Sequence, residues 1–216
     1  MSEQFNLFGQ PQSADSDKKL PEESEPRILY FDLETQKSAD DVGGWNNIHL
    51  MKLAVGVVWD SREEGFLTCL EHEADQLVDK LKSADLVVGF NVKGFDYTVL
   101  QPYSSIDLQE IPTFDMLLDV RKQLGFRLSL NHLAQHSLNA KKSADGMTSL
   151  QWFKEGKMDK IIEYCKKDVE ITRDLFLFGE KNGYVGYKSK SGSLNQLKVD
   201  WDPSKLIAGE KVSSRS

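Results

Sequence analysis

Four short apolar runs dominate the first hundred residues. They span residues 28–35, 53–60, 65–70 and 86–90. Each run is β-prone and short enough to be a buried strand, so we expect four strands here. A polar turn over residues 61–64 joins the second run to the third, which predicts a hairpin and therefore antiparallel pairing. Apolar positions at Leu77, Val78 and Leu81 predict an amphipathic helix over residues 71–83, before the fourth strand.

The second half of the chain predicts one more strand, three helices and a closing hairpin. These elements span residues 111–115, 116–124, 128–134 and 159–178, and the hairpin pairs 183–188 with 194–201. Ser129 is the expected N-cap of the middle helix. Three antiparallel strands, a helix and a strand that can pair in parallel with the first describe an α/β domain. We therefore expect a ribonuclease-H-like mixed β-sheet, antiparallel in its first three strands and parallel later, flanked by helices and followed by a C-terminal β-hairpin.

Length and composition favour one globular unit with appendages. The chain has 216 residues and a net charge of −7. We expect a disordered tail over residues 1–26, a domain over 27–181 and an extension over 182–216. The sequence has no run of about eighteen apolar residues and its N-terminus is polar, which predicts no membrane insertion or secretion and favours a cytoplasmic protein. Cys69 and Cys165 are expected to be free, buried thiols.

The first apolar run carries two carboxylates, Asp32 and Glu34, two residues apart. Because side chains alternate along a strand, both are expected on one side, where like charges held close together need a cation to neutralise them. The pair therefore predicts a metal site, and the alternative is a strand that simply runs into a solvated acidic loop. The net acidity of the chain is compatible with a polyanionic substrate, because bound divalent cations would add positive charge locally.

Two later stretches supply the partners that a metal site needs. Residues 89–91 (Gly-Phe-Asn) are followed by residues 95–96 (Phe-Asp), and Tyr164 and Asp168 lie four residues apart on one face of a predicted helix. With residues 31–35 (Phe-Asp-Leu-Glu-Thr), these stretches resemble, in order and spacing, the three motifs of the DEDD superfamily of 3′-5′ exonucleases. Tyr164 in the third motif, where other members have His, resembles the tyrosine subclass of this superfamily. Over about residues 27–201, the sequence resembles the bacterial predicted-exonuclease branch that has a C-terminal extension.

The resemblance implies a nuclease site with two divalent ions, Mg²⁺ or Mn²⁺, because all-oxygen ligands favour these metals over zinc. The implied catalytic metal ligands are Asp32, Glu34, Asp96 and Asp168. Tyr164 would orient the attacking water, since a phenol with a pKa of about 10 is a weak base at neutral pH. The residues implied to cradle the terminal nucleotide are Leu33, Thr35, Asn91 and Phe95. Asp115, at the end of the strand over residues 111–115, is expected to have a structural role.

A polar loop over residues 36–51 contains Gly43, Gly44 and Trp45, just downstream of the acidic pair. An aromatic side chain beside two glycines is a candidate stacking platform for a base, or part of a mobile lid. The alternative is that Trp45 folds back onto the core, where it would have no contact with a substrate.

The N-terminal tail contains one apolar island over residues 4–8. Short apolar motifs in polar tails commonly dock into a partner's groove and become ordered on binding. The island resembles the motif that binds the bacterial sliding clamp, and the residues that would contact the clamp are Gln4, Phe5, Leu7 and Phe8. The alternatives are a chance match and an additional strand that packs on the domain.

Three functions stay open at this point. The first is a DNA exonuclease that acts on a free 3′ end, preferably of single-stranded DNA, and is recruited to the sliding clamp in replication or repair. The second is an RNA exonuclease of the same chemistry. The third is a non-catalytic module on this fold that binds nucleic acid or the clamp. The intact acids and Tyr164 weigh against the third function, and only the motif in the tail favours DNA over RNA.

Overall fold

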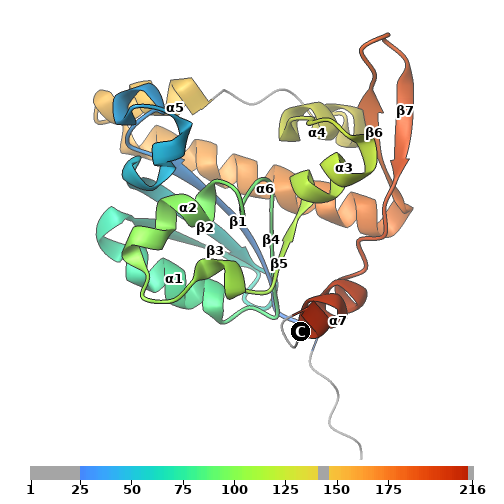
Figure 1. Cartoon of the computed structure of the whole chain (residues 1–216), viewed down its shortest axis with the longest axis horizontal. Coiled ribbons are helices and arrows are strands. Elements are labelled where there is room, and N and C mark those ends of the chain that lie inside the picture. The colour runs from blue at the N-terminus through green and yellow to red at the C-terminus, as the bar shows by residue number, and fades with distance from the viewer. Residues whose placement is uncertain (1–24, 141–145, 214–216) are drawn as a thin grey trace, which may run out of the picture.

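The computed structural model describes residues 25–140 and 146–213 and has a five-stranded sheet at its centre (Figure 1). The strands are β1 (Ile28–Thr35), β2 (Leu53–Asp60), β3 (Gly65–Leu70), β4 (Leu86–Gly89) and β5 (Thr113–Asp115). Their order across the sheet is β3-β2-β1-β4-β5. β1 pairs antiparallel with β2 and parallel with β4, and β5 continues the parallel part. The prediction of a mixed sheet, antiparallel first and parallel later, is therefore confirmed.

Helices cover both faces of the sheet (Figure 1). The helices are α1 (Ala74–Lys82), α2 (Asp96–Leu100), α3 (Met116–Leu124), α4 (Leu130–Leu138), α5 (Gly146–Lys154), α6 (Met158–Asn182) and α7 (Pro203–Ser213). α1 and α2 pack on one face of the sheet, and the long helix α6 packs with α3 and α4 on the other. No helix within the described ranges is both long enough and apolar enough to cross a membrane.

Alternate residues of β1 enter two separate hydrophobic cores. Leu29 and Phe31 are buried with α1 and α2, whereas Tyr30 is buried with α6. Because the side-chain period of a strand is two residues, Asp32 and Glu34 continue the series of Tyr30. The acidic pair therefore lies on the face that α6 covers.

Local sequence signals set several element ends. The Ser129 hydroxyl accepts a hydrogen bond from the backbone N–H of His132 at 3.2 Å, so the predicted cap of α4 is confirmed. α6 ends at Asn182 and is followed by Gly183, whose φ of 71° lies in the left-handed region that favours glycine. The helix expected over residues 71–83 begins only at Ala74, because the three preceding residues form a 3₁₀ turn.

Some elements were not predicted. α5 and α7 have no counterpart in the sequence-based expectations, and two short 3₁₀ helices, Asp40–Val42 and Trp45–Leu50, occupy the region expected to be a polar loop. Three further 3₁₀ turns within the described ranges span Glu71–Glu73, Gln101–Tyr103 and Leu108–Glu110. Both cysteines are free and buried, as expected. The clamp-like motif at residues 4–8 lies outside the described residues.

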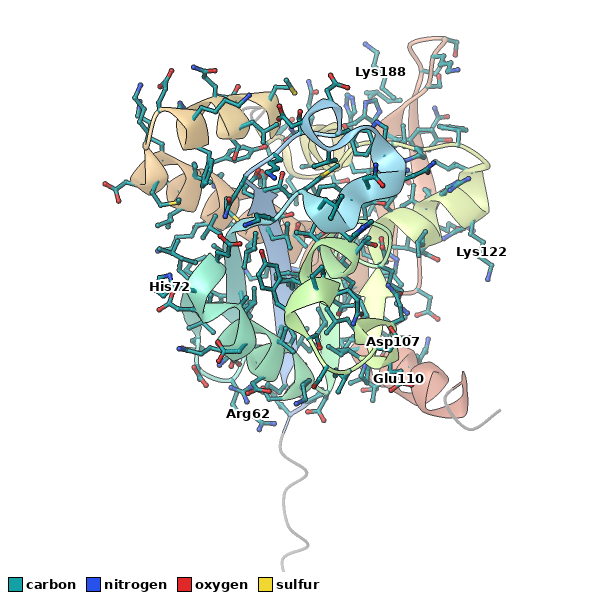
Figure 2. All side chains as sticks on the ribbon, turned by 60° about the vertical axis from the view of Figure 1, so that its left-hand side comes forward. Arg62, His72, Asp107, Glu110, Lys122 and Lys188 are labelled. Atoms are coloured by element: carbon teal, nitrogen blue, oxygen red, sulfur yellow. The ribbon has the colours of Figure 1, made fainter. Side chains whose placement is uncertain are left out.

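The C-terminal hairpin forms as predicted and packs on the domain. Its strands are β6 (Tyr184–Lys188) and β7 (Leu194–Lys198). In the middle of β6, the Gly186 N–H donates to the Ser137 hydroxyl of α4 at 2.9 Å. Lys188 on the hairpin and Lys122 on α3 project from the surface (Figure 2). Trp201, which follows the hairpin, is 1 % exposed and lies in the same core as α6.

Candidate active site

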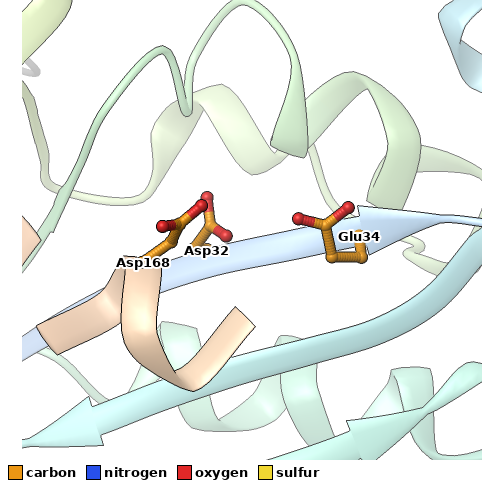
Figure 3. A group of neighbouring side chains, drawn as sticks. All are labelled: Asp32, Glu34 and Asp168. Atoms are coloured by element: carbon orange, nitrogen blue, oxygen red, sulfur yellow. The ribbon is translucent and has the colours of Figure 1, made fainter. Parts of the chain in front are cut away.

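Three carboxylates from two distant segments converge beside β1. Asp32 and Glu34 come from β1, and Asp168 comes from α6 (Figure 3). One oxygen from each of the three groups can be chosen so that all lie within 4.8 Å of one another. A cluster of carboxylate oxygens at this spacing can share a divalent cation. Packing of α6 on β1 therefore brings the first and third sequence motifs together.

The cluster raises the pKa of its own carboxyls. Burial raises the pKa of Asp32 well above its usual range, and the neighbouring charges of Asp96 and Asp168 raise it further. Burial likewise raises the pKa of Glu34 to about 8. Within residues 25–140 and 146–213, neither Asp32 nor Glu34 forms an ion pair with a basic side chain. Within the described residues these two buried carboxylates therefore have no cationic partner, and an all-oxygen donor set of this kind fits Mg²⁺ or Mn²⁺.

Asp96 lies beside this cluster rather than within it. It is 3 % exposed and begins α2, and its Oδ1 accepts a hydrogen bond from the backbone N–H of Leu33 at 3.2 Å. Burial is the largest cause that raises the pKa of Asp96. Its charge is close enough to raise the pKa of Asp32. The carboxylate of the second motif thus faces β1 but is tied to the backbone of that strand.

Tyr164 lies one helical turn before Asp168 on α6. The indole ring of Trp152 from α5 packs edge-on against the phenol, with ring centroids 6.2 Å apart. Burial, and next the charge of Asp168, raise the pKa of Tyr164. The phenol therefore stays protonated at physiological pH and can orient a water molecule, but it cannot act as a base.

A pocket of about 620 Å³ opens on one side of the cluster. The residues expected to contact a nucleotide all line it, namely Leu33, Thr35, Trp45, Asn91 and Phe95. Trp45 is 69 % exposed, so the alternative that it folds onto the core is wrong. Its ring lies 6.4 Å from that of Phe95. The pocket therefore has an aromatic wall next to the carboxylates.

A second pocket of about 530 Å³ is lined by Tyr164 and Asp168. It shares Phe90 and Asn91 with the first pocket. Arg127 also lines it and donates a hydrogen bond to the Asn91 side chain at 3.3 Å. The two pockets therefore adjoin at Phe90 and Asn91, and carboxylates of the cluster line both of them.

Asp115 holds the loop that carries the second motif. Its Oδ1 accepts from the backbone N–H of Asn91 at 2.9 Å, and its Oδ2 accepts from that of Lys93 at 3.1 Å. The same carboxylate caps α3 through the N–H of Leu117 at 3.0 Å. Asn91 has a φ of 69°, a left-handed conformation that Asn adopts more readily than most residues. The structural role expected for Asp115 agrees with these contacts.

Sequence reasoning missed Arg127 and the contribution of α5. Arg127 stands between a glycine-containing turn and the cap of α4, where no motif marks it. Met147 and Leu150 of α5 line the first pocket, and Ser149 is buried beside Glu34. The weak amphipathic pattern of this short helix contains no signal for a site. Met147, Ser149 and Leu150 can be assigned to the site only from the packing of α5 against β1.

Removal of divalent cations should make the stability of the protein fall as the pH rises. The pKa of Glu34 is about 8 in the folded chain against 4.5 for a free side chain, so between these values the folded state binds more protons than the unfolded state. This stabilisation is complete below the lower pKa and is lost as the pH passes the higher one. In chelator, we expect a melting temperature roughly 5 °C or more lower at pH 8.5 than at pH 6.

Differential scanning fluorimetry across this pH range measures the effect. Saturating Mn²⁺ should remove the decrease, because the cation binds the ionised carboxylates. Glu34→Gln should have a shallower dependence in chelator than the wild-type protein. An equally steep dependence in Glu34→Gln would contradict the assignment of the effect to this carboxyl.

Comparison with known proteins agrees with this architecture. A family model of the RNase_H superfamily, RNase_H_2, matches residues 29–177. A search of curated protein sequences finds no match. Among the solved structures that match is the family B DNA polymerase from the hyperthermophilic archaeon Pyrobaculum calidifontis, with a TM-score of 0.53 and 16% sequence identity. The match covers 72% of this chain and 24% of the polymerase, so the chain spans about a quarter of that protein's length.

At this level of identity the likeness to the polymerase concerns the fold alone. The family model, by contrast, covers more than half of the chain and includes β1, α2 and most of α6, which together carry all four acids and Tyr164. Nucleases with a ribonuclease-H-like domain use divalent metals, and the acidic cluster lies in the matched region. The chain therefore belongs to the RNase_H superfamily of nuclease-type proteins.

Proposed function

We propose that the protein is a metal-dependent 3′-5′ exonuclease of the tyrosine DEDD subclass. The observation that carries the proposal is the convergence of the three carboxylates with Tyr164 where the two pockets meet. Tyr164 and Asp168 are one helical turn apart, so the phenol and the carboxylate face the same space. A protein that kept only the fold would have no need for this buried, mutually repelling set of acids.

The proposed roles of the acids follow from their positions. Asp32, Glu34 and Asp168 would hold the divalent cations, for which Mg²⁺ or Mn²⁺ fits best. Asp96 would support the site from the start of α2. Two such ions, when bound, supply an activated water and stabilise the charge that develops on the phosphate and the leaving oxygen.

Tyr164 would orient the attacking water, since its raised pKa keeps the phenol protonated. In the reaction the oxygen of water bonds to the phosphorus, and the bond between phosphorus and the 3′ oxygen of the preceding nucleotide breaks. The products are a nucleoside 5′-monophosphate and a strand that is one nucleotide shorter with a new 3′-hydroxyl.

The two pockets support a substrate strand that ends beside the cluster. Trp45 and Phe95 would stack on the terminal base, and the backbone near Leu33 and Thr35 would cradle its sugar. In the second pocket, Arg127 is exposed and forms no ion pair with a carboxylate of the described chain. It would bind a phosphate further along the strand. This arrangement favours a free, single-stranded 3′ end.

DNA is proposed as the substrate on the strength of the apolar island at residues 4–8, which resembles a sliding-clamp motif. We propose that this island recruits the enzyme to the clamp in replication or repair, as a member of the bacterial predicted-exonuclease branch. The proposed catalytic unit is residues 27–181, with residues 182–216 as an extension that supports it.

Hydrolysis of 5′-labelled single-stranded DNA and RNA of matched sequence, with Mg²⁺ or Mn²⁺, tests the proposal. We expect a ladder of DNA products that shortens from the 3′ end. Asp168→Asn should lower the rate by more than about 100-fold, because it removes a direct metal ligand. Asp174→Asn on the outer part of the same helix is the matched control and should be as active as the wild-type protein.

Each outcome decides something specific. A preference for RNA would assign the same chemistry to RNA processing. It would also indicate that the resemblance of residues 4–8 to a clamp-binding motif is a chance match. Products that shorten from the 5′ end would contradict the proposed polarity. No product on either substrate, from a protein that is folded and binds Mn²⁺, would overturn the catalytic proposal.

A further inference from the structure

Ser149 is a buried polar residue with no role in the proposal above. It lies on α5 and has a relative exposure of 0 %. Its neighbours on the helix are part of the site: Met147 and Leu150 line the first pocket, and Trp152 packs on Tyr164. α5 also contacts β1, the strand that carries Asp32 and Glu34. Ser149 therefore lies on a helix that borders the acidic cluster.

The Ser149 hydroxyl is a neighbour of the Glu34 carboxylate. It lies close enough for hydrogen bonding to lower the pKa of that carboxyl and so oppose the effect of burial. Within the part of the chain that the structure describes, its Oγ forms no hydrogen bond of ordinary geometry. A buried hydroxyl that lacks a good partner is unfavourable, so an apolar residue would stabilise the fold better at this position. Hydrogen bonds in active sites are commonly long until the bound state is formed.

Asp32 has a neutral partner of a similar kind. The Cys165 thiol of α6 donates to the backbone carbonyl of Asp32 at 3.4 Å and lies 3.6 Å from its Oδ2. Both carboxylates of β1 are thus approached by an uncharged donor, and neither forms an ion pair within the described residues. Uncharged donors can fix the orientation of a carboxylate while leaving its negative charge available to a cation.

We propose that Ser149 is a positioning residue for Glu34, whose hydroxyl orients this carboxylate for a divalent cation and so ties α5 to the metal site. The inference rests on the proposed function, in which the cluster of Asp32, Glu34 and Asp168 binds Mg²⁺ or Mn²⁺. The hydroxyl does not touch the substrate in this scheme. Its contribution is to the affinity for the metal.

Titration of the full chain with Mn²⁺ in a calorimeter, without nucleic acid, tests the role of Ser149. Ser149→Ala should raise the dissociation constant for Mn²⁺ about tenfold, which is the lower end of the effect typical for groups that orient metal ligands. Ser149→Cys retains a weak donor of similar size and should fall between Ser149→Ala and the wild-type protein. Gln151→Ala, exposed on the same helix, is the control and should bind like the wild type.

The melting temperature in chelator separates positioning from a structural role. Ser149→Ala should melt at the same temperature as the wild-type protein or above it, since the change removes a poorly paired hydroxyl. Equal Mn²⁺ affinity in Ser149→Ala and wild type would overturn the inference, as would a lower melting temperature that accompanies the loss of affinity. Failure of the wild-type protein itself to bind Mn²⁺ would instead overturn the proposed metal site.

Discussion

Asp32→Asn should produce a protein that is more stable than the wild type in chelator and is inactive. Burial and the charges of Asp96, Asp168 and Glu34 all oppose ionisation of Asp32, so the amide removes a repulsive charge at similar size. We expect the melting temperature in chelator at pH 8 to rise by roughly 2–8 °C, which corresponds to about 1–2 kcal/mol for a domain of this size. Stability and activity should change in opposite directions because the cluster is arranged for a cation.

The same substitution should abolish the response to metal. Mn²⁺ should raise the melting temperature of the wild-type protein but not that of Asp32→Asn. The rate of hydrolysis should fall by at least about 1,000-fold, because loss of a group that only orients a metal ligand already lowers activity by about 10–100-fold. Asp79→Asn on α1 is the matched control, because Asp79 is exposed and, among the residues that the structure describes, its only ion pair is with Lys82 at the surface. A variant that loses stability in chelator would show that Asp32 supports the fold and not a metal site.

Trp201→Ala should destabilise the protein by about 3–5 kcal/mol, the range typical of a buried Trp replaced by Ala. The indole is 1 % exposed and stacks on Phe176 with ring centroids 6.0 Å apart. Its ring is also in a T-shaped arrangement with that of Phe114 of β5, with centroids 5.7 Å apart, and its Nε1 donates to Asp119 of α3 at 2.9 Å. The substitution would therefore remove contacts with the sheet and two helices, and would leave a cavity in the core.

Urea unfolding followed by circular dichroism measures the loss. Gly179→Ala should weaken the same contact, because a Cβ at this position would collide with the Trp201 ring. Leu194→Ala at the exposed tip of the hairpin is the control and should change the free energy of unfolding by less than about 0.5 kcal/mol. A loss below about 1 kcal/mol for Trp201→Ala would mean that the extension proposed for residues 182–216 unfolds separately from the domain.

Local patterns determined much of the architecture and part of the candidate site. The alternation along β1 predicted that Asp32 and Glu34 share one face, because the period of a strand is two residues whatever packs against it. The helical period of α6 likewise predicted that Tyr164 and Asp168 share a face. The hairpin between β2 and β3, the cap at Ser129 and the C-terminal hairpin depend on turns of a few residues, which sequence alone can encode.

Contacts between segments far apart in the chain decided the rest. The packing of α6 on β1 brings Asp168 to the acidic pair, while Asp96 is held by the backbone of Leu33 outside the closest group. α5 has little periodicity of its own, so only its place against β1 makes Ser149 a neighbour of Glu34. Tertiary structure likewise places Arg127 in the lining of the second pocket. The sequence determined which side chains share a face of their own element, whereas tertiary structure decided which faces meet, because that depends on packing across the whole core.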